Sequence, residues 1–570
     1  MKQNFWLLVL LNIYISCSNS SFGQELYLKI SGKTPTENKI LEQIDYTEKF
    51  QDYLSLEKEV VSFLENIERK GFIESSIESF SKVNDSTYIA EVNLKNTYSK
   101  IRIHLPENFI DERNYDELQF YTSEITTTYI ETEFENIAYV LSYLNKLLTQ
   151  VGNTFATVQL KNISAQKDSE NILLADVHID KGELRRITKI NIEGYENFPS
   201  SFLKHTIDLK PGQLFDEEKL LEKSLLLENL GFVKNIKPPE ILFTEDETEV
   251  FLYLEKNNNN IFDGIIGFAT DEESGNIEFN GYLNLVLSNN LNYGEKLIVN
   301  YKNDGNNQEQ FFIRTELPFL FQSPFGLEAE LSIFNRDTTF TSVEQSLLVN
   351  YQLNTKTKLF SGYKSFRSEN LNNEAAVVNL IEDLTSRFGV IGFNYQRPQN
   401  NSLFPYKTII NNTNEFGKRD IKGLNTNQIR TRLRGEHLFN LNFQNSIFIG
   451  GSMAALFSEN YFINELFRFG GITSIRGFDE NSIDASIYSV LNTEYRYLLS
   501  SDSYIHSILD FAYFENSALH IQGNLYSFGF GLGLQTKAGI FKLNIANGKQ
   551  DSQSFRFSNT KIHLSLNAVF

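Results

Sequence analysis

The residue types that usually catalyse reactions or bind metals are scattered through this sequence and form no recognisable site. The seven histidines include no pair at the H-x-x-x-H spacing that places two metal ligands on one helix face. The sequence lacks the G-x-S-x-G motif of a nucleophilic serine and the phosphate loop of nucleotide-binding proteins. Gly529, Gly531 and Gly533 alternate with Phe and Leu, and this period of two indicates a strand rather than a nucleotide loop. We therefore expect no enzymatic activity, no metal and no cofactor.

Three arginines lie at alternate positions of one predicted strand. Arg430, Arg432 and Arg434 alternate with apolar or small polar residues, so they share one face. An arginine that faces lipid at the bilayer midplane costs about 2–4 kcal/mol. We expect the three to form a basic stripe on the lumen side of a barrel. The plainer alternative is that water in an open pore solvates them.

A long segment between two predicted strands is unusually apolar for a surface loop. It runs from Phe467 to Phe478, reads FRFGGITSIRGF, and ends in Arg476-Gly477-Phe478. A loop on the surface has no need of so many apolar side chains, whereas a loop folded back into a barrel can bury them. We expect this segment to fold into the interior.

The second half of the chain, residues 261–570, reads as strands throughout. In its last segment Ile562 and Leu564 alternate with polar residues. About 16 such segments are separated by turn residues, which is the pattern of a transmembrane β-barrel of antiparallel strands. A closed barrel pairs every backbone group without leaving an edge, as lipid requires. The alternative is a soluble β-sandwich. The predicted segments start near 261, 276, 293, 309, 325, 340, 355, 385, 404, 427, 445, 484, 503, 524, 538 and 559.

The first half of the chain mixes helical and strand patterns and is expected to repeat one small α+β unit. The clearest copy has the order β-α-α-β-β, with a long helix that ends at Gly231 before two strands. The alternative is three unrelated small domains. The predicted units span 24–97, 98–182 and 183–256, the long helices of the first two span about 53–70 and 132–150, and the linker to the barrel is 257–260.

The first 23 residues read as an export signal. An apolar run from Phe5 to Ile15 follows Lys2, and small or polar residues follow the run. Cleavage is expected after Gly23, which would leave a mature chain without cysteine. The alternative is a lipoprotein signal that modifies Cys17.

Composition excludes several classes of protein. The formal net charge of −20 argues against a nucleic-acid partner, because phosphate binding needs basic patches. One cysteine excludes a disulfide scaffold. The mean hydropathy of −0.30 is compatible with a barrel, in which apolar and polar residues alternate.

These features together resemble the outer-membrane protein insertase superfamily of BamA and TamA type. That family carries an Arg-Gly-Phe element in a long outer loop, usually after Gly-Gly, as in residues 470–478 here (GGITSIRGF). The α+β units resemble POTRA domains, which are small periplasmic modules. The resemblance covers the mature chain, most clearly 185–256 and 465–570, and the size is closest to TamA. The implied fold is a series of periplasmic α+β repeats followed by an all-β membrane barrel.

The resemblance also implies a set of site residues. Glu494 and Asp510 lie where the family carries a lumen-facing glutamate and, on the following strand, an aspartate. Arg476, with Gly477 and Phe478, is then expected to lock the loop to these acids, since a guanidinium can bind a carboxylate through two hydrogen bonds. The alternative is a loop arginine in water. The chain departs from the family in its degenerate first two units and in the lack of the usual glycine after Asp510.

The resemblance implies a device that inserts or translocates proteins at a bacterial outer membrane, with its N-terminal units in the periplasm. Phe570 matches the terminal aromatic by which outer-membrane strands are recognised. The implied partners are unfolded outer-membrane or secreted clients, periplasmic subunits bound at POTRA edges, and membrane lipid. The barrel seam is expected to open laterally. The alternatives are a two-partner-type secretion pore, a passive porin-like channel, and a scaffold that displays an enzyme.

Overall fold

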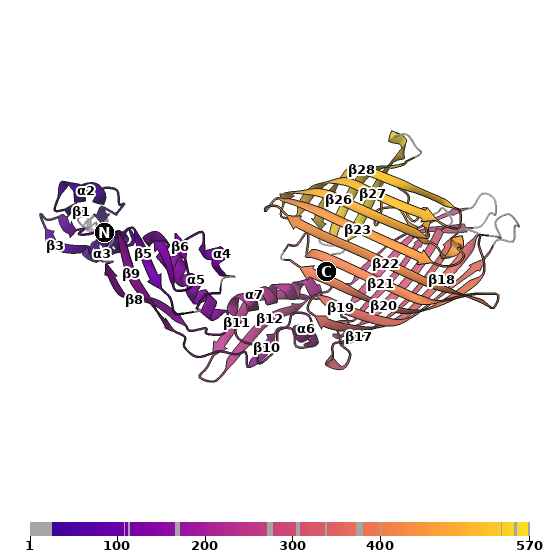
Figure 1. The fold of residues 1–570 in the computed structure, drawn as a ribbon, viewed down its shortest axis with the longest axis horizontal. Helices are drawn as coiled ribbons and strands as arrows, with labels where there is room; N and C mark the ends of the chain where they lie inside the picture. The colour runs from indigo at the N-terminus through magenta and orange to yellow at the C-terminus, as the bar shows by residue number, and fades with distance from the viewer. Residues whose placement is uncertain are drawn as a thin grey trace, which may run out of the picture. The chain divides into compact units, whose positions relative to one another are not determined.

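In the computed structural model the chain folds into two compact units (Figure 1). One unit reaches to Arg185 and includes Leu214–Asp216, and the other contains Arg186–Gln213 and the chain from Glu217 onward. The expected signal peptide and Phe570 lie outside the described residues. The structure describes residues 25–107, 109–111, 114–165, 171–270, 277–303, 308–336, 339–371, 380–399, 401–536, 539–551 and 556–567.

The first module is a four-stranded sheet covered by a long helix. The helix begins where Asp52 accepts a hydrogen bond from the Ser55 backbone N–H at 2.8 Å, as an N-cap residue does. Its buried side chains recur every three or four residues and pack on the sheet. The sheet order is β2-β1-β4-β3. The elements are β1 (Leu26–Gly32), α2 (Pro35–Leu41), β2 (Lys49–Phe50), α3 (Tyr53–Arg69), β3 (Ser76–Lys82) and β4 (Thr87–Asn93).

The second module carries an additional hairpin that the sequence interpretation missed. The helix expected over 132–150 begins only at Ile137, because Tyr129–Glu133 is a strand that pairs with the strand Lys100–His104. Glu131 in this strand accepts hydrogen bonds from Lys100 (3.1 Å) and Arg102 (2.9 Å), which favours the strand pairing. The sheet order is β6-β7-β5-β9-β8. The elements are β5 (Lys100–His104), α4 (Tyr115–Leu118), β6 (Glu124–Ile125), β7 (Tyr129–Glu133), α5 (Ile137–Thr149), β8 (Thr157–Ala165) and β9 (Ile172–Asp180).

The third module has the predicted order of one strand, two helices and two strands. Its second helix is followed by a short 3-10 turn that ends at Gly231, whose φ of 75° is readily adopted only by glycine. The sheet order is β10-β12-β11. The elements are β10 (Lys189–Glu193), α6 (Ser201–His205), α7 (Glu217–Leu226), β11 (Val233–Phe243) and β12 (Thr248–Lys256).

No helix among the described residues is long and apolar enough to cross a membrane.

Aromatic and polar contacts join the third module to two turns of the following sheet. The hydroxyl of Tyr195 accepts a hydrogen bond from Asn289 and donates one to Asn292, both at 2.8 Å. The ring of Phe202 packs edge-on against Phe319, with centroids 4.8 Å apart. We call the end of the sheet that carries these turns the module end, and the other end the loop end.

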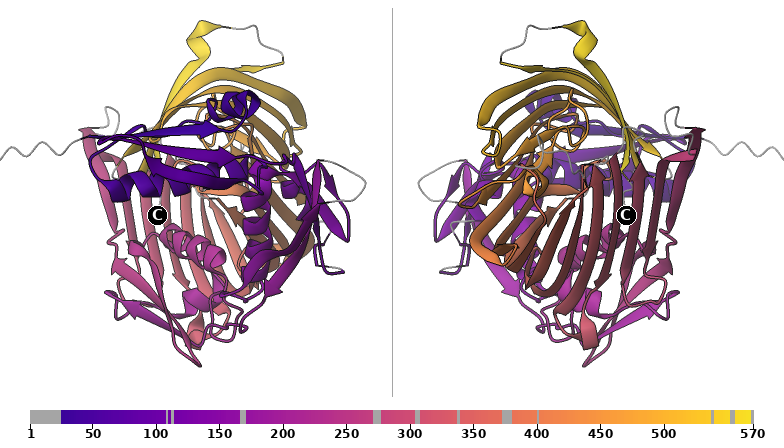
Figure 2. Two further views of the ribbon diagram at one scale, coloured as in Figure 1. Left: turned by 90° about the vertical axis from the view of Figure 1, so that its left-hand side faces the viewer. Right: turned by 90° about the vertical axis from the view of Figure 1, so that its right-hand side faces the viewer.

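The remainder of the chain forms one antiparallel sheet of 16 strands, as predicted (Figure 2). Its order follows the sequence from β13 to β30. The predicted closure differs, because β13 and β30 lie at the two edges of the sheet and no pairing between them occurs among the described residues. The strands are β13 (Ile261–Thr270), β14 (Ile277–Ser288), β15 (Lys296–Asn303), β16 (Gln308–Leu317), β17 (Phe325–Arg336), β18 (Phe340–Asn354), β19 (Thr357–Asn370), β20 (Leu384–Pro398), β21 (Tyr406–Ile421), β22 (Leu424–Asn440), β23 (Asn445–Phe457), β26 (Ile487–Ser500), β27 (Ser503–Asn516), β28 (Ile521–Thr536), β29 (Gly539–Gln550) and β30 (Thr560–Asn567).

The large sheet turns apolar side chains outward and polar ones inward. In β27, Leu509 and Phe511 are exposed, whereas His506 and Asp510 are buried. This is the reverse of a soluble sandwich, which buries its apolar face, and it matches a sheet that lipid surrounds. The same pattern exposes Ile429, Leu433, Leu491, Tyr526, Phe528 and Phe530 on other strands of the sheet.

Candidate functional site

The connection between β23 and β26, residues 458–486, folds into the interior of the curved sheet, and we call it the inner loop. It contains a two-stranded hairpin of β24 (Phe467–Phe469) and β25 (Ile483–Ala485). Figure 2 shows these orange segments on the inner side of the curved sheet. Phe469 and Ile475 of the loop are buried in a cluster with Val490 and Phe514 of the wall. The apolar segment is therefore inside, as its composition predicted.

Arg476 is held by two carboxylates on adjacent strands. Its Nε lies 2.8 Å from Oδ2 of Asp510 and its Nη2 lies 2.5 Å from Oδ1, which is a two-pronged contact. Its Nη1 donates to Glu494, and its backbone N–H also donates to Asp510 at 3.1 Å. All three side chains are buried. The structure thus brings together Arg476, Glu494 and Asp510, three of the five residues that the resemblance singled out, and we call these three the clamp.

Gly477 follows the clamp at a point where two backbones touch. Its φ of 82° favours glycine, and a Cβ there would lie 2.5 Å from the backbone N of Gly548 in β29. A Cβ at Gly548 would in turn lie 2.7 Å from the ring of Phe478. The Gly477 N–H also donates to Nε2 of His563 in β30, at 3.0 Å. The element after Arg476 therefore sits directly on the last two strands.

A second ion pair fixes the start of the inner loop, and the sequence interpretation missed it. Glu465 accepts a hydrogen bond from Arg419 at 2.5 Å and from Gln428 at 2.7 Å. The Arg419 side chain is only 1% exposed. Its place on the same strand face as Glu415 and Gly417 was the available signal, but nothing in the sequence identifies Glu465 as its partner.

The predicted basic stripe points inward, and two of its members are paired rather than solvated. Arg432 lies 2.6 Å from Glu415, and Arg430 lies 3.6 Å from the same carboxylate. Both guanidinium groups lie 4.9 Å from the ring of Phe467 in the inner loop, a distance typical of cation–π contacts. Arg434 is exposed and pairs with Glu436 at 2.7 Å. The solvated-pore alternative thus describes only Arg434.

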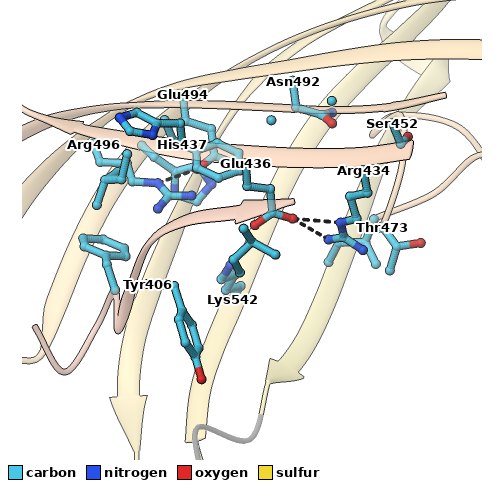
Figure 3. A pocket seen from close by; sticks show the side chains of 18 of the residues that line it. Tyr406, Arg434, Glu436, His437, Ser452, Thr473, Asn492, Glu494, Arg496 and Lys542 are labelled. Carbon is cyan, nitrogen blue, oxygen red and sulfur yellow. Dashed lines mark hydrogen bonds and ion pairs between the residues drawn. The ribbon is translucent and has the colours of Figure 1, made fainter. Parts of the chain in front are cut away.

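A polar cavity of about 510 Å³ lies beside the clamp (Figure 3). Strand residues such as Arg434 and Lys542 line its wall, and Thr473 of the inner loop lines another side. In Figure 3, Arg434 contacts Glu436 and Arg496 contacts Glu494, each pair lying on one strand that lines the cavity. The arrangement offers charged and hydrogen-bonding groups. Among the described residues, no group of side chains that could hold a metal ion occurs.

One segment of the chain matches a known protein family. Residues 185–255 match the family described as POTRA, surface antigen variable number repeat. No curated protein matches this chain.

Several solved structures resemble the fold at low sequence identity. BamA from Haemophilus ducreyi lacking POTRA domains 1–3 is 14% identical, with a TM-score of 0.47, over 82% of this chain and 98% of that one. CdiB from Acinetobacter baumannii is 15% identical, with a TM-score of 0.46, over 83% and 90%. CdiB from Escherichia coli is 14% identical, with a TM-score of 0.46, over 90% and 97%.

Proposed function

We propose that this chain is an outer-membrane β-barrel that assists the insertion, assembly or translocation of other proteins, without catalysing a chemical reaction. The observation that carries the proposal is a 16-stranded antiparallel sheet that turns apolar side chains outward and holds the inner loop on the clamp inside. The POTRA match over 185–255 supports a role that involves other proteins.

The proposed location follows from the two faces of the sheet. Lipid outside suits the exposed Leu and Phe side chains, and the buried charges need a polar interior. The third module contacts turns at the module end, which would face the periplasm. The expected signal peptide is consistent with export.

Clients would be recognised through their backbones. The sheet of each module has an edge strand, β3, β8 or β11, that pairs with one neighbour in the sheet order. An extended client or a periplasmic partner subunit can add a strand at such an edge.

The seam of the barrel lies between β13 and β30, the two edge strands of the large sheet. This seam would open laterally and offer unpaired backbone groups to a client strand. No nucleic acid and no cofactor enters this account.

A secretion pore is the second candidate. A 16-stranded barrel is wide enough to leave an aqueous channel when nothing fills it. A chain could therefore pass through the lumen if the inner loop moved out. A passive porin is less favoured, because the inner loop is held by buried ion pairs at Glu465 and at Arg476.

Folding of a client in vesicles tests the proposal. The purified full chain is placed in liposomes, an unfolded outer-membrane barrel is added from urea, and folding is followed by the heat-dependent shift of its gel mobility. We expect severalfold faster folding than in empty liposomes or in liposomes with an unrelated barrel. Equal rates would overturn the insertion role. Transport of a dedicated secreted partner into the vesicles, without client folding, would favour the secretion pore.

A further inference from the structure

The turn between β20 and β21 crosses the interior of the sheet from the module end. Successive antiparallel strands place this turn at the same end as the turns that contact the third module, opposite the inner loop. We call its described residues, 399 and 401–405, the inner turn. Leu403 and Phe404 are only 3% and 8% exposed, although turn residues usually lie at the surface.

These two side chains contact β27 and β29, which lie near the last edge of the sheet, as well as β22, which is next to β21. Phe404 packs edge-on against Tyr504 of β27, with ring centroids 4.9 Å apart. Leu403 and Phe404 share a buried cluster with Leu438 of β22 and Ile540 of β29. The turn leaves the eighth and ninth strands of the sheet and reaches strands near its last edge, so it spans the interior.

The turn is also braced in this shape by its own polar groups. Asn401 Oδ1 accepts hydrogen bonds from the backbone N–H groups of Leu403 and Phe404, both at 3.0 Å. Gln399 Nε2 donates to the Phe404 carbonyl at 2.7 Å. Such side-chain bonds to nearby backbone fix a turn independently of strand pairing.

Arg496 connects this turn to the clamp. Its guanidinium carbon lies 4.7 Å from the Phe404 ring and 4.1 Å from the Phe448 ring. Its Nε donates to Oε2 of Glu494 at 2.7 Å, while Oε1 of the same carboxylate accepts from Arg476. Glu494 is therefore shared by an arginine from the inner loop and an arginine that stacks on the inner turn. The cavity of about 510 Å³ lies between the two segments and is lined by both.

We propose that the inner turn is a second stopper of the lumen, and that Arg496 is a positioning residue that couples it to the clamp through Glu494. The lumen is then closed from both ends, by Phe404 from the module end and by the inner loop from the loop end. Displacing Phe404 frees Arg496 and alters the contacts of Glu494, so that the two closures open together. This inference goes beyond the proposed function, because it concerns the passage of ions and does not require a client.

Ion conductance of the full chain in planar bilayers tests the stopper. Phe404→Ala removes the ring, and Phe443→Ala is the matched control, because Phe443 is 92% exposed on another turn of the module end. We expect open probability to rise about tenfold in Phe404→Ala, which corresponds to about 1.4 kcal/mol of lost closure. We expect no change in Phe443→Ala. Equal conductance of Phe404→Ala and the wild type would overturn the stopper.

The coupling is tested by combining Phe404→Ala with Arg476→Ala. If the closures are coupled, the open probability of the double variant rises by less than the product of the increases in the two single variants. Arg496→Lys keeps the charge but loses the planar stacking surface, so it should bring the effects of the two substitutions closer to multiplicative. Strictly multiplicative effects would overturn the role of Arg496. Only variants that retain the heat-dependent gel shift of a folded barrel are compared.

Thiol labelling measures the burial of the inner turn with a single substitution. In a chain produced from residue 24 onward, which lacks Cys17, Leu403→Cys should react with a charged maleimide far more slowly than Phe443→Cys. Equal labelling rates in folded protein would contradict the buried turn.

Discussion

Arg476 donates hydrogen bonds to the carboxylate oxygens of Asp510 from two guanidinium nitrogens, at 2.8 Å and 2.5 Å, and from its backbone N–H, at 3.1 Å. These three bonds tie a loop from one end of the sheet to the inner face of β27. A charge-assisted, two-pronged contact is stronger and more directional than a single hydrogen bond. The loop is thus attached at one defined point of the wall rather than by diffuse packing.

Arg476→Ala should loosen the inner loop. Removing one partner of a buried pair typically costs about 3–5 kcal/mol, because the remaining carboxylates lose their compensation. We expect a lower urea midpoint of unfolding and higher bilayer conductance, with the barrel still able to enter membranes. Arg367→Ala is the matched control, since the exposed side chain of Arg367 pairs with Glu369 and does not line the cavity beside the clamp. Full client-assembly activity and unchanged conductance for Arg476→Ala would contradict the role of the clamp.

Gly548→Ala should push the inner loop away from β29. The new Cβ would lie 2.5 Å from the Gly477 carbonyl oxygen and 2.7 Å from the ring of Phe478, and such overpacking costs about 1–3 kcal/mol. Limited proteolysis should then cleave the inner loop faster. Gly435→Ala is the control, because nothing lies within 4 Å of its added Cβ. Identical cleavage of the two variants would show that the backbone contact is unimportant.

Tyr195→Phe should weaken the joint between the third module and the sheet. The change leaves buried Asn289 without its hydroxyl partner, which costs about 1–3 kcal/mol. Hydrogen–deuterium exchange of residues 289–295 should become faster. Tyr293→Phe makes the same chemical change at an exposed ring and should leave exchange unaltered. No acceleration in Tyr195→Phe would mean that this hydroxyl does not hold the joint.

The second module should lose stability in acid through Glu131. Burial alone would raise the pKa of Glu131, but hydrogen bonds from Arg102 and Lys100 outweigh it and hold the pKa below its usual value of 4.5. A carboxylate with a depressed folded-state pKa stabilises the fold above its unfolded pKa, and this contribution is lost as the pH falls through the folded value. The protection of β7 against hydrogen exchange, relative to the intrinsic exchange rate at each pH, should therefore fall below about pH 4.5 in the wild type and less so in Glu131→Gln. Glu133→Gln, at an exposed position of the same strand, should keep the wild-type dependence.

The sequence predicted the large sheet well because each strand has its own period of two. The expected starts near 261, 325, 340, 445 and 503 agree with the strands, since alternation and turn residues are local signals. The additional strand β7 was missed, because a short run before a helix carries little periodicity. Closure of the sheet depends on its first and last strands, β13 and β30, which are far apart in the sequence, and local patterns do not specify such a pairing.

The candidate site was only partly predictable. Arg476, Glu494 and Asp510 were singled out by resemblance, and their contacts follow from how the inner loop folds. Arg496 lies two residues from Glu494 and so on the same face of its strand, a signal that was available. The inner turn gave none, because the burial of Phe404 depends on residues about a hundred positions away, such as Tyr504.

The most direct test of the proposed function locks the seam of the sheet. Cysteine pairs that scan β13 against β30 are introduced into the chain from residue 24 onward, which has no native cysteine, and client folding in liposomes is measured before and after reduction. Pairs within the continuous sheet, between β20 and β21, are the matched control. Lateral opening predicts that oxidation of a seam pair stops client folding, that reduction restores it, and that the control pair has no effect. Unchanged client folding with a fully oxidised seam would contradict the account.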